Sequence, residues 1–308
     1  RFTSFRTPVA LQCPWVLLPA PLNGAIPGPG TVPIRRRAVG CAARLGPLGH
    51  HRRMTRAWLG ALVLLLSTLS PVACAGHRSS GAATITPSAA PVQADPLIGA
   101  VFLGAGDLHT CTAGVLHSGT ENLILTAAHC LASNYPATFV PGFTDHADAS
   151  MTWTIDAIYL DSRWLADRNT AADFAIARVG RQSGGSLESA TGPGLTLGTA
   201  PDSGTLVRVV GYPLAVGGPP IGCSAATGTE PGGVPSVQCA GLVDGTSGAP
   251  WRKDSTVVGL TGGLHGGGCD GSTSYSPPFD GRVVDLLHRA EASGPADAAP
   301  EAFDSDCG

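Results

Sequence analysis

The chain has 308 residues and a formal net charge of −3, but its charges are unevenly distributed. Residues 1–94 contain ten arginines and no acidic residue, whereas residues 95–308 hold all 22 acidic residues and nine basic ones, a net charge of −13. So sharp a change marks a boundary in the chain. The acidic part cannot neutralise phosphates, so we expect no nucleic-acid partner, and it is long enough for one large domain or two small lobes.

Residues 54–75 have the features of a secretory signal peptide. Arg56 precedes an apolar run at 57–66, and small residues end in an A-x-A cleavage pattern around Cys74. The run is short for a membrane span, so we expect an extracellular protein with no stable span once the signal is removed. A signal-anchor or buried helix is the less favoured alternative. Cys74 also leaves open a lipid anchor, although Pro71 stands where such sites usually have leucine.

The segments that flank the signal and the end of the chain are expected to lie outside the folded domain. Residues 1–53 are rich in proline and arginine without clear periodicity, and we interpret them as a non-native upstream extension or as disordered chain. Residues 76–96 have the Ser, Ala, Thr and Pro content of a linker or propeptide. Residues 291–308 become polar and rich in alanine and proline, which predicts a C-terminal tail.

Residues 97–290 consist of short apolar stretches separated by Gly, Pro, Asn and Asp. Two of these stretches are Leu123–Ala127 and Phe174–Val179. Many short segments rich in Val, Ile, Leu and Thr predict an all-β barrel or sandwich. Apolar residues between Val283 and Ala290 recur at helical spacing and predict one C-terminal helix.

Three short strings, in the order His, Asp, Ser, carry the groups that peptide hydrolysis needs. A serine hydroxyl is a weak nucleophile unless an imidazole accepts its proton and later passes it to the leaving amine. A carboxylate fixes the tautomer of that imidazole and stabilises its charged form. We therefore interpret His129, Asp173 and Ser247 as catalytic residues, within the strings Leu125–Cys130, Ala172–Ile176 and Asp244–Trp251.

The turn around Ser247 also predicts an oxyanion-binding site. Glycines at 245 and 248 let the backbone bend so that two N–H groups converge beside the hydroxyl. We expect the backbone N–H groups of Gly245 and Ser247 to be these donors, and one such donor is worth about 3–4 kcal/mol in the transition state.

Over residues 97–290 these strings resemble the trypsin-like, chymotrypsin-fold serine peptidases, and secreted bacterial members most of all. T-A-A-H-C matches the family's catalytic-histidine motif, D-F-A-I its aspartate string, and G-T-S-G-A-P resembles its G-D-S-G-G-P string. The resemblance implies two antiparallel β-barrels of the six-stranded type, packed together with the cleft between them. It also implies an endopeptidase that acts on polypeptides through an acyl-enzyme, and a bridge between Cys111 and Cys130. No metal-ligand cluster, phosphate loop or nucleotide fingerprint appears in the sequence, so we expect no cofactor or metal.

One departure from the family concerns activation. Thr246 stands where trypsin has an aspartate that pairs with a newly cut N-terminal amine, and no Ile-Val-Gly-Gly start precedes Val101. A threonine cannot form that ion pair, so we expect Thr246 to hydrogen-bond within its own loop. We also expect that activity does not depend on insertion of a new N-terminus, and that residues 95–98 are free on the surface. The alternative is that another acid, such as Asp244, takes over the pairing.

The resemblance also places a substrate pocket, at Gly241 six residues before Ser247 and on a later strand with Thr261 and Gly263. Members that cleave after Arg or Lys have aspartate at the first position, so cleavage after basic residues is not supported. Glutamyl endopeptidases place a histidine where Thr261 stands. We expect His265, four residues on, to lie in a glycine-rich loop.

Six cysteines follow the signal segment, an even number that is typical of disulfides in an exported protein. Six cysteines allow fifteen pairings. Besides the bridge implied by the resemblance, spacing favours Cys223–Cys239, which leaves Cys269 with Cys307. Free or metal-binding thiols are less favoured, because no C-x-x-C pair occurs.

Two other functions compete with a peptidase. A non-catalytic binding protein on the same fold is disfavoured, because members without activity usually lack a triad residue. An esterase is disfavoured because Ala249 interrupts the G-x-S-x-G pattern and the order of the triad differs from that of the esterase fold. We expect a monomer.

Overall fold

The computed structural model describes residues 86–132, 134–268 and 271–301. The expected upstream extension and signal peptide, Cys74, Cys269 and Cys307 lie outside these residues. Among the helices that are described, none has the length and apolar character needed to cross a membrane.

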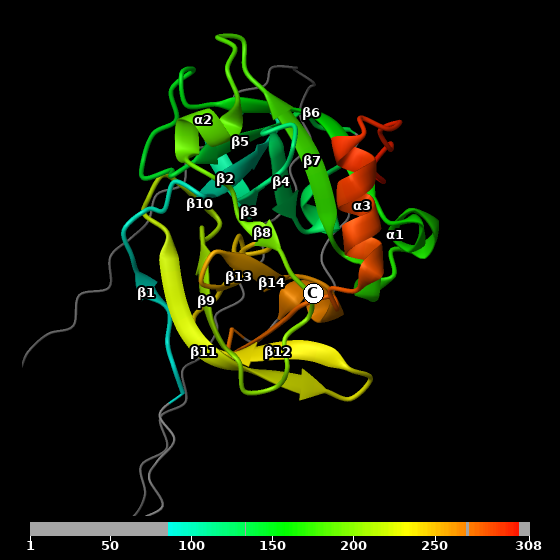
Figure 1. Cartoon of the computed structure of the whole chain (residues 1–308). Helices are drawn as coiled ribbons and strands as arrows, with labels where there is room; N and C mark the ends of the chain where they lie inside the picture. The colour runs from blue at the N-terminus through cyan, green and yellow to red at the C-terminus, as the bar shows by residue number, and fades with distance from the viewer. Residues whose placement is uncertain (1–85, 133, 269–270, 302–308) are drawn as a thin grey trace, which may run out of the picture. The chain divides into compact units, whose positions relative to one another are not determined.

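The described chain is mostly β-structure with a few short helices (Figure 1). Its strands are β1 Ala90–Pro91, β2 Ile98–Leu103, β3 Leu108–Leu116, β4 Leu123–Thr126, β5 Ala137–Pro141, β6 Trp153–Leu160, β7 Ala175–Gly180, β8 Thr196–Leu197, β9 Leu206–Gly211, β10 Ala215–Val216, β11 Ile221–Glu230, β12 Val234–Gln238, β13 Pro250–Lys253, β14 Thr256–Leu260 and β15 Thr273–Tyr275. The helices are α1 Ser162–Asp167, α2 Leu187–Thr191 and α3 Gly281–Glu291, with 3₁₀ turns η1 Ala128–Cys130, η2 Thr170–Ala172 and η3 Leu264–Gly267.

The first half of the domain is a closed six-stranded barrel. The strand order is β10-β3-β2-β5-β6-β7-β4, and β4 pairs again with β3, so that β10 alone lies outside the ring. Strands β4 and β7 are buried along most of their length, and α3 packs against β6 and β7. Side chains such as Ile98, Phe139 and Trp153 fill a core that α3 extends. The apolar stretches of the sequence are therefore barrel strands, as expected.

The second half is an antiparallel sheet with its own core. Its order is β15-β12-β11-β9-β13-β14-β8, with β1 paired to β11, and only the short β8 runs parallel to its neighbour β14. Val209, Leu242 and Trp251 belong to its separate hydrophobic cluster. Two β-structured halves, each with its own core, and a C-terminal helix confirm the predicted fold class, the chymotrypsin-like double barrel. The second sheet is called the second barrel below.

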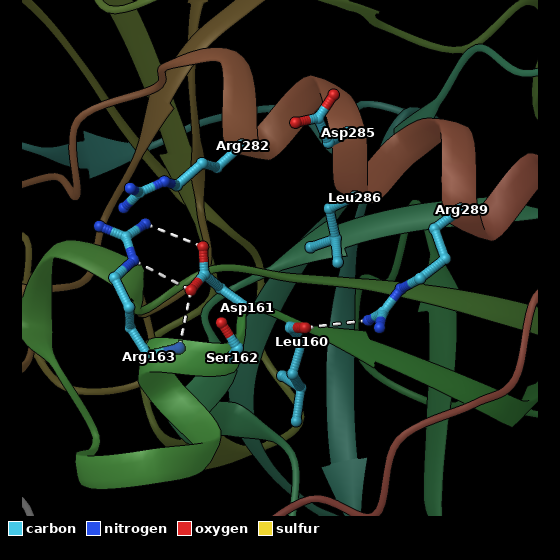
Figure 2. A pocket seen from close by; sticks show the side chains of 8 residues that line it. All are labelled: Leu160, Asp161, Ser162, Arg163, Arg282, Asp285, Leu286 and Arg289. Atoms are coloured by element: carbon cyan, nitrogen blue, oxygen red, sulfur yellow. Dashed lines mark hydrogen bonds and ion pairs between the residues drawn. The ribbon is translucent and has the colours of Figure 1, made fainter.

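The C-terminal helix fixes the chain that follows it. Asp280 accepts a hydrogen bond from the backbone N–H of Arg282 at 2.9 Å and so caps the N-terminus of α3. Arg289, near its end, donates to the carbonyl of Leu160 at 2.9 Å (Figure 2) and pairs with the carboxylate of Asp297. Asp297, in the expected tail 291–308, also accepts a hydrogen bond from the backbone N–H of Leu160 at 2.8 Å, so this part of the tail is bound to β6. The hollow between α1 and α3 drawn in Figure 2 shares no residue with the cleft described below.

Residues 86–96, assigned from composition to a linker or propeptide, are bound to the second barrel. The backbone N–H of Ala89 donates to the carbonyl of Ala240 at 2.7 Å, and the N–H of Ala240 donates to the carbonyl of Pro87 at 2.8 Å. The expectation that residues 95–98 are free on the surface is wrong. Asp95 forms an ion pair with Arg252, and Ile98 is fully buried as the first residue of β2.

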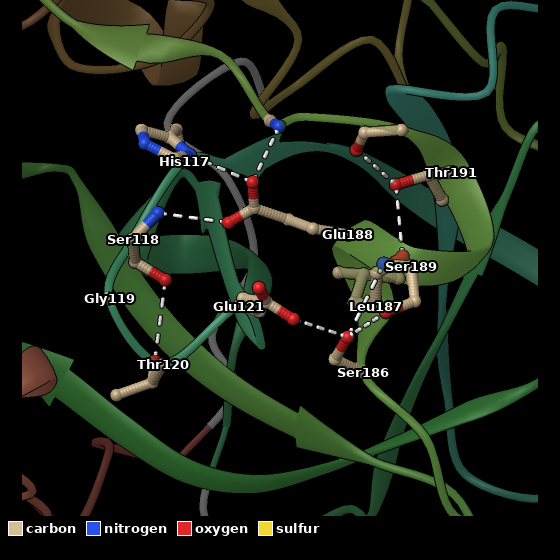
Figure 3. Close-up of polar contacts among 12 residues, drawn as sticks. His117, Ser118, Gly119, Thr120, Glu121, Ser186, Leu187, Glu188, Ser189 and Thr191 are labelled. Carbon is tan, nitrogen blue, oxygen red and sulfur yellow. Dashed lines mark hydrogen bonds and ion pairs between the residues drawn. The ribbon is translucent and has the colours of Figure 1, made fainter.

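A cluster of polar contacts attaches α2 to the end of β3 (Figure 3). The carboxylate of Glu188 contacts Nδ1 of His117 at 2.8 Å and accepts hydrogen bonds from the backbone N–H groups of Ser118 and Gly194, both at 2.9 Å. Burial of Glu188 would raise its pKa, but these hydrogen bonds hold the pKa below its ordinary value. These contacts anchor α2 to the end of β3.

Candidate active site

His129 and Asp173 meet at the end of the first barrel. Strands β4 and β7 are antiparallel partners with Thr126 opposite Ala175, so the turn after β4 and the residue before β7 lie at the same edge. Nδ1 of His129 is 2.7 Å from Oδ2 of Asp173, and the backbone N–H of His129 donates to Oδ1 at 2.9 Å. The N–H of Gly263 donates to Oδ2 at 2.7 Å.

These contacts set the charges of the pair. Asp173 is only 1% exposed. Burial would raise the pKa of Asp173, but the His129 ring and the N–H groups of Gly263 and His129 hold it below its ordinary value. Burial would likewise lower the pKa of His129, but the charge and hydrogen bond of Asp173 outweigh it and raise the pKa. Asp173 therefore stays a carboxylate that stabilises a protonated His129.

Ser247 lies in a tight loop that needs glycine on either side. Gly245 has φ +89°, and a Cβ atom there would lie 2.2 Å from the backbone nitrogen of Leu214. Gly248 has φ +81°, and a Cβ atom there would lie 2.1 Å from the carbonyl oxygen of Thr112. The backbone N–H of Thr112 donates to the carbonyl of Ser247 at 2.8 Å, which ties this loop to the first barrel.

The loop leaves two backbone donors without acceptors. The carbonyl of Asp244 accepts from the N–H of Leu214 at 2.7 Å, and the N–H of Gly245 belongs to the same peptide unit and points the opposite way. Among the residues that the structure describes, the N–H groups of Gly245 and Ser247 have no hydrogen-bond acceptor. Such a pair of N–H groups can stabilise a negatively charged oxygen.

His129 and Ser247 line one cleft of about 430 Å³ between the two barrels. The hydroxyl Oγ of Ser247 donates to the carbonyl of Gly266 at 3.5 Å. The structure thus brings His129 to hydrogen-bond distance of Asp173 and places Ser247 in the same cleft, with its hydroxyl turned toward the glycine-rich loop. Hydrogen bonds at active sites are often formed fully only when substrate is bound.

Thr246 satisfies its polar groups within its own loop, as expected. Its side chain is buried, Oγ1 donates to the carbonyl of Val243 at 2.7 Å, and its backbone N–H donates to the same carbonyl at 3.1 Å. Asp244, the alternative pairing acid, is exposed and forms no ion pair with any described residue. Thr246 is therefore held by neutral hydrogen bonds within its loop.

The two disulfides with described partners are both present, Cys111–Cys130 and Cys223–Cys239. The first joins β3 to the residue after His129, so it restrains the turn that presents the imidazole. The sulfur atoms of Cys111 and Cys130 and a ring nitrogen of His129 lie within 4.8 Å of one another. Because the sulfurs are joined to each other, they do not offer the thiolates that bind metals.

The three residues predicted for the substrate pocket have different positions. Thr261 lines the cleft, and its hydroxyl accepts a hydrogen bond from Nε1 of the buried Trp251 at 3.2 Å. Gly263 instead holds Asp173, and Gly241 lies beside Ala89, so neither lines the cleft. The wall of the cleft is formed instead by Leu242, Val243 and Gly266–Gly268. His265 lies in the glycine-rich turn η3, as expected.

Sequence reasoning missed a clamp formed by Thr112. Its hydroxyl donates to the carbonyl of Gly245 at 3.0 Å and accepts from the backbone N–H of Tyr212 at 2.8 Å. One buried side chain thus connects the loop of Ser247 to the first barrel. A threonine in a β-strand is common, so no local signal distinguishes this one.

Comparisons with known proteins agree with this geometry. Residues 111–260 match a family model described as a trypsin-like peptidase domain. Similar solved structures include the protease Anisep from Arthrobacter nicotinovorans, at 23% identity, TM-score 0.57, 66% of this chain and 99% of that chain. A Glu endopeptidase is 18% identical with a TM-score of 0.54, and the match covers 67% of this chain and 97% of that chain. Human heparin binding protein is 16% identical with a TM-score of 0.51, and the match covers 69% of this chain and 100% of that chain. No curated protein sequence matches the chain. At these identities the structural likeness shows a shared fold.

Proposed function

The chain contains a trypsin-like peptidase domain, and on this basis we propose that it is a secreted serine endopeptidase with His129, Asp173 and Ser247 as its triad. The observation that supports the proposal most directly is the ionised Asp173, which is buried and bonded to both the ring and the backbone of His129. Burying a charge is unfavourable, so a buried charge facing an imidazole at a cleft favours a functional role.

The proposed reaction proceeds by acyl transfer. Oγ of Ser247 attacks the scissile carbonyl carbon while Nε2 of His129 accepts its proton, because Nδ1–H is held by Asp173. The carbonyl oxygen becomes negative and accepts hydrogen bonds from the N–H groups of Gly245 and Ser247. His129 then protonates the leaving amine, the C–N bond breaks and an ester with Ser247 remains. Water cleaves this ester with His129 again as the base.

One rotation precedes this chemistry. In the structure the Ser247 hydroxyl donates to Gly266, whereas attack needs it to donate to His129. A turn about the Cα–Cβ bond of Ser247 would move the hydroxyl between these acceptors. Since the bond to Gly266 is long, at 3.5 Å, little stabilisation is lost in the exchange.

The fold alone does not exclude a binding protein, since human heparin binding protein has a similar one. An esterase would use the same acyl-transfer residues. We favour a peptidase over both because the matched family model is that of a peptidase domain, and because residues of both barrels, from Leu103 and Leu214 to Gly268, line the cleft that holds Ser247. The two disulfides and the segment 54–75 favour an extracellular location. Lipid anchoring at Cys74 is the alternative, and we propose that the enzyme is a monomer.

Labelling with a fluorophosphonate probe separates these functions. We expect the probe to modify Ser247, as identified by mass spectrometry of the labelled peptide, and the same protein to cleave a peptide library. Ser247→Ala abolishes both results, whereas Ser255→Ala, at an exposed turn serine, changes neither. Labelling without peptide cleavage would indicate an esterase, and absence of labelling a binding protein.

A further inference from the structure

We infer that the cleft continues past His129 as a shallow apolar groove that selects the residue on the leaving-group side of the scissile bond, with preference for an aliphatic side chain. The inference rests on the proposed peptidase function. It names a specificity surface formed by Leu103, Leu108, Leu214 and Val216.

The lining of the cleft falls into two groups. Leu242, Val243 and Gly266–Gly268 belong to the second barrel, and the carbonyl of Gly266 accepts from the Ser247 hydroxyl. Leu103 and Thr110 come from the first barrel, with Thr110 next to Cys111 of the disulfide beside His129, and Leu214 lines the same cleft. Since His129 donates its proton to the leaving amine, the leaving segment must begin beside His129 and extend along this second group.

The leaving-group side has exposed aliphatic side chains. Leu214 is 49% exposed, and two residues on, Val216 is 71% exposed. Strand β10 pairs with β3 so that Val216 lies directly opposite Leu108, which is 44% exposed, and directly opposed side chains stand on one face of a sheet. Aliphatic groups that adjoin one another and open onto a cleft mark a binding surface.

Residues that are neighbours in the chain line the cleft and a second hollow. Leu103 and Leu214 line the cleft with Ser247, whereas Phe102 and Val216 line a hollow of about 270 Å³ together with Phe143. A β-bulge between Val101 and Phe102 removes Thr110 from the ladder of β2 and β3, and Thr110 lies in the cleft at this point. Bulges of this kind occur beside active sites, where they redirect a side chain.

The charges of the groove exclude one class of residue. Asp244 is exposed on the lining of the cleft, and Asp107 and Asp145 line the nearby hollow. His146 also lines that hollow, where its Nε2 contacts Asp145 at 3.0 Å, and no lysine or arginine lines either space in the described chain. An acidic residue after the scissile bond would meet these carboxylates without an arginine or lysine to pair with, so we expect it to be disfavoured.

Acyl transfer to added amines tests the groove independently of the acyl side. A peptide ester forms the acyl-enzyme, and an amino-acid amide then competes with water for it. The amine nitrogen forms the new amide bond, His129 takes its proton and returns it to Oγ of Ser247, and the ester bond to Ser247 breaks. The ratio of aminolysis to hydrolysis measures binding on the leaving-group side and does not depend on how much enzyme is active.

We expect leucinamide to give a ratio about tenfold higher than glycinamide, because a leucine side chain would be partly buried in the groove. Aspartic acid α-amide should give a ratio below that of glycinamide. Leu214→Ser should bring the leucinamide ratio close to that of glycinamide. Leu206→Ser, which removes an exposed leucine at 67% exposure from a strand of the second barrel, is the matched control and should keep the preference.

The outcomes distinguish the two proposals. An acyl-enzyme burst with equal ratios for leucinamide and glycinamide would overturn the groove and leave the serine peptidase intact. An unchanged leucinamide preference in Leu214→Ser would overturn the assignment to these residues. Absence of any acyl-enzyme from the ester would overturn the peptidase proposal, and the groove with it.

Discussion

The carboxylate of Asp173 is hydrogen-bonded to both the ring and the backbone of His129. One of its oxygens accepts from Nδ1 of the ring, and the other accepts from the backbone N–H. The ring cannot turn away from the carboxylate without losing a bond at 2.7 Å, and the turn that bears it is fixed at 2.9 Å. The third bond, from Gly263, connects the same carboxylate to the second barrel. One buried side chain thus sets the tautomer, orientation and charge of the proposed base.

Replacement of Asp173 by asparagine should therefore change both the rate and its pH dependence. We expect kcat/KM to fall by about 10⁴-fold, as the imidazole adopts the wrong tautomer. The base must be neutral to act, and Asp173 raises the pKa of His129. Without the carboxylate, the acid limb of the kcat/KM profile should move to lower pH.

The chain offers a matched control for this variant. The pKa of His117 is also raised, chiefly by its hydrogen bond to Glu188, but neither residue lines the cleft. Glu188→Gln should leave the acid limb where it is. A profile that moves with Glu188→Gln, or that does not move in Asp173→Asn, would contradict the assignment of the limb to His129.

Thr246 should be needed to keep the loop of Ser247 in the conformation that presents the N–H groups of Gly245 and Ser247. Thr246→Val keeps the volume and removes the hydrogen bond from Oγ1 to Val243. The lost bond is worth about 0.5–1.5 kcal/mol, and we expect kcat to fall about two- to tenfold with a smaller effect on KM. Thr246→Ser keeps the hydroxyl and should retain most of the activity. Equal kcat for the valine variant and the wild type would show that the bond does not support the loop.

The sequence predicted those parts of the site that depend on strand pairing. His129 follows the apolar stretch that forms β4, and Asp173 precedes the stretch that forms β7. Because β4 and β7 are partner strands, the two residues converge, as their motifs indicated. The bridge of Cys111 to Cys130 came from the same family motif. The placement of Ser247 between two glycines required by positive φ also agrees with its motif.

The pocket walls were not predictable in the same way. Gly263, His265 and Gly266 have φ values of +82°, +50° and +60°, so the chain after Thr261 leaves the extended path. A loop of this kind has no side-chain period from which its course can be read. The attachment of the segment 86–96 to the second barrel was missed for a related reason. Backbone hydrogen bonds, such as that from Ala89 to Ala240, can form with almost any residue type and cannot be predicted from amino-acid composition.

Trimming of the N-terminus should reduce stability without activating the enzyme. A chain that starts at Pro96 loses the ion pair of Asp95 with Arg252 and the bonds between Ala89 and Ala240, so its Tm should lie below that of a chain starting at Gly76. A chain starting at Thr86 keeps these contacts and is the control. The Gly76 chain should already cleave peptides, since Thr246 needs no new amine. Activity that arises only after trimming would contradict this prediction.

The two disulfides should differ in their effects on activity. Replacing both cysteines of either bridge by alanine should lower the free energy of unfolding by about 2–4 kcal/mol, measured by denaturant titration. Only loss of Cys111–Cys130 also loosens the turn of His129, so kcat/KM at a temperature where both variants are folded should fall more in that variant. Cys223–Cys239 closes a loop ahead of Ser247, and its residues do not line the cleft. Equal losses of kcat/KM in both variants would show that the first bridge has no role in positioning His129.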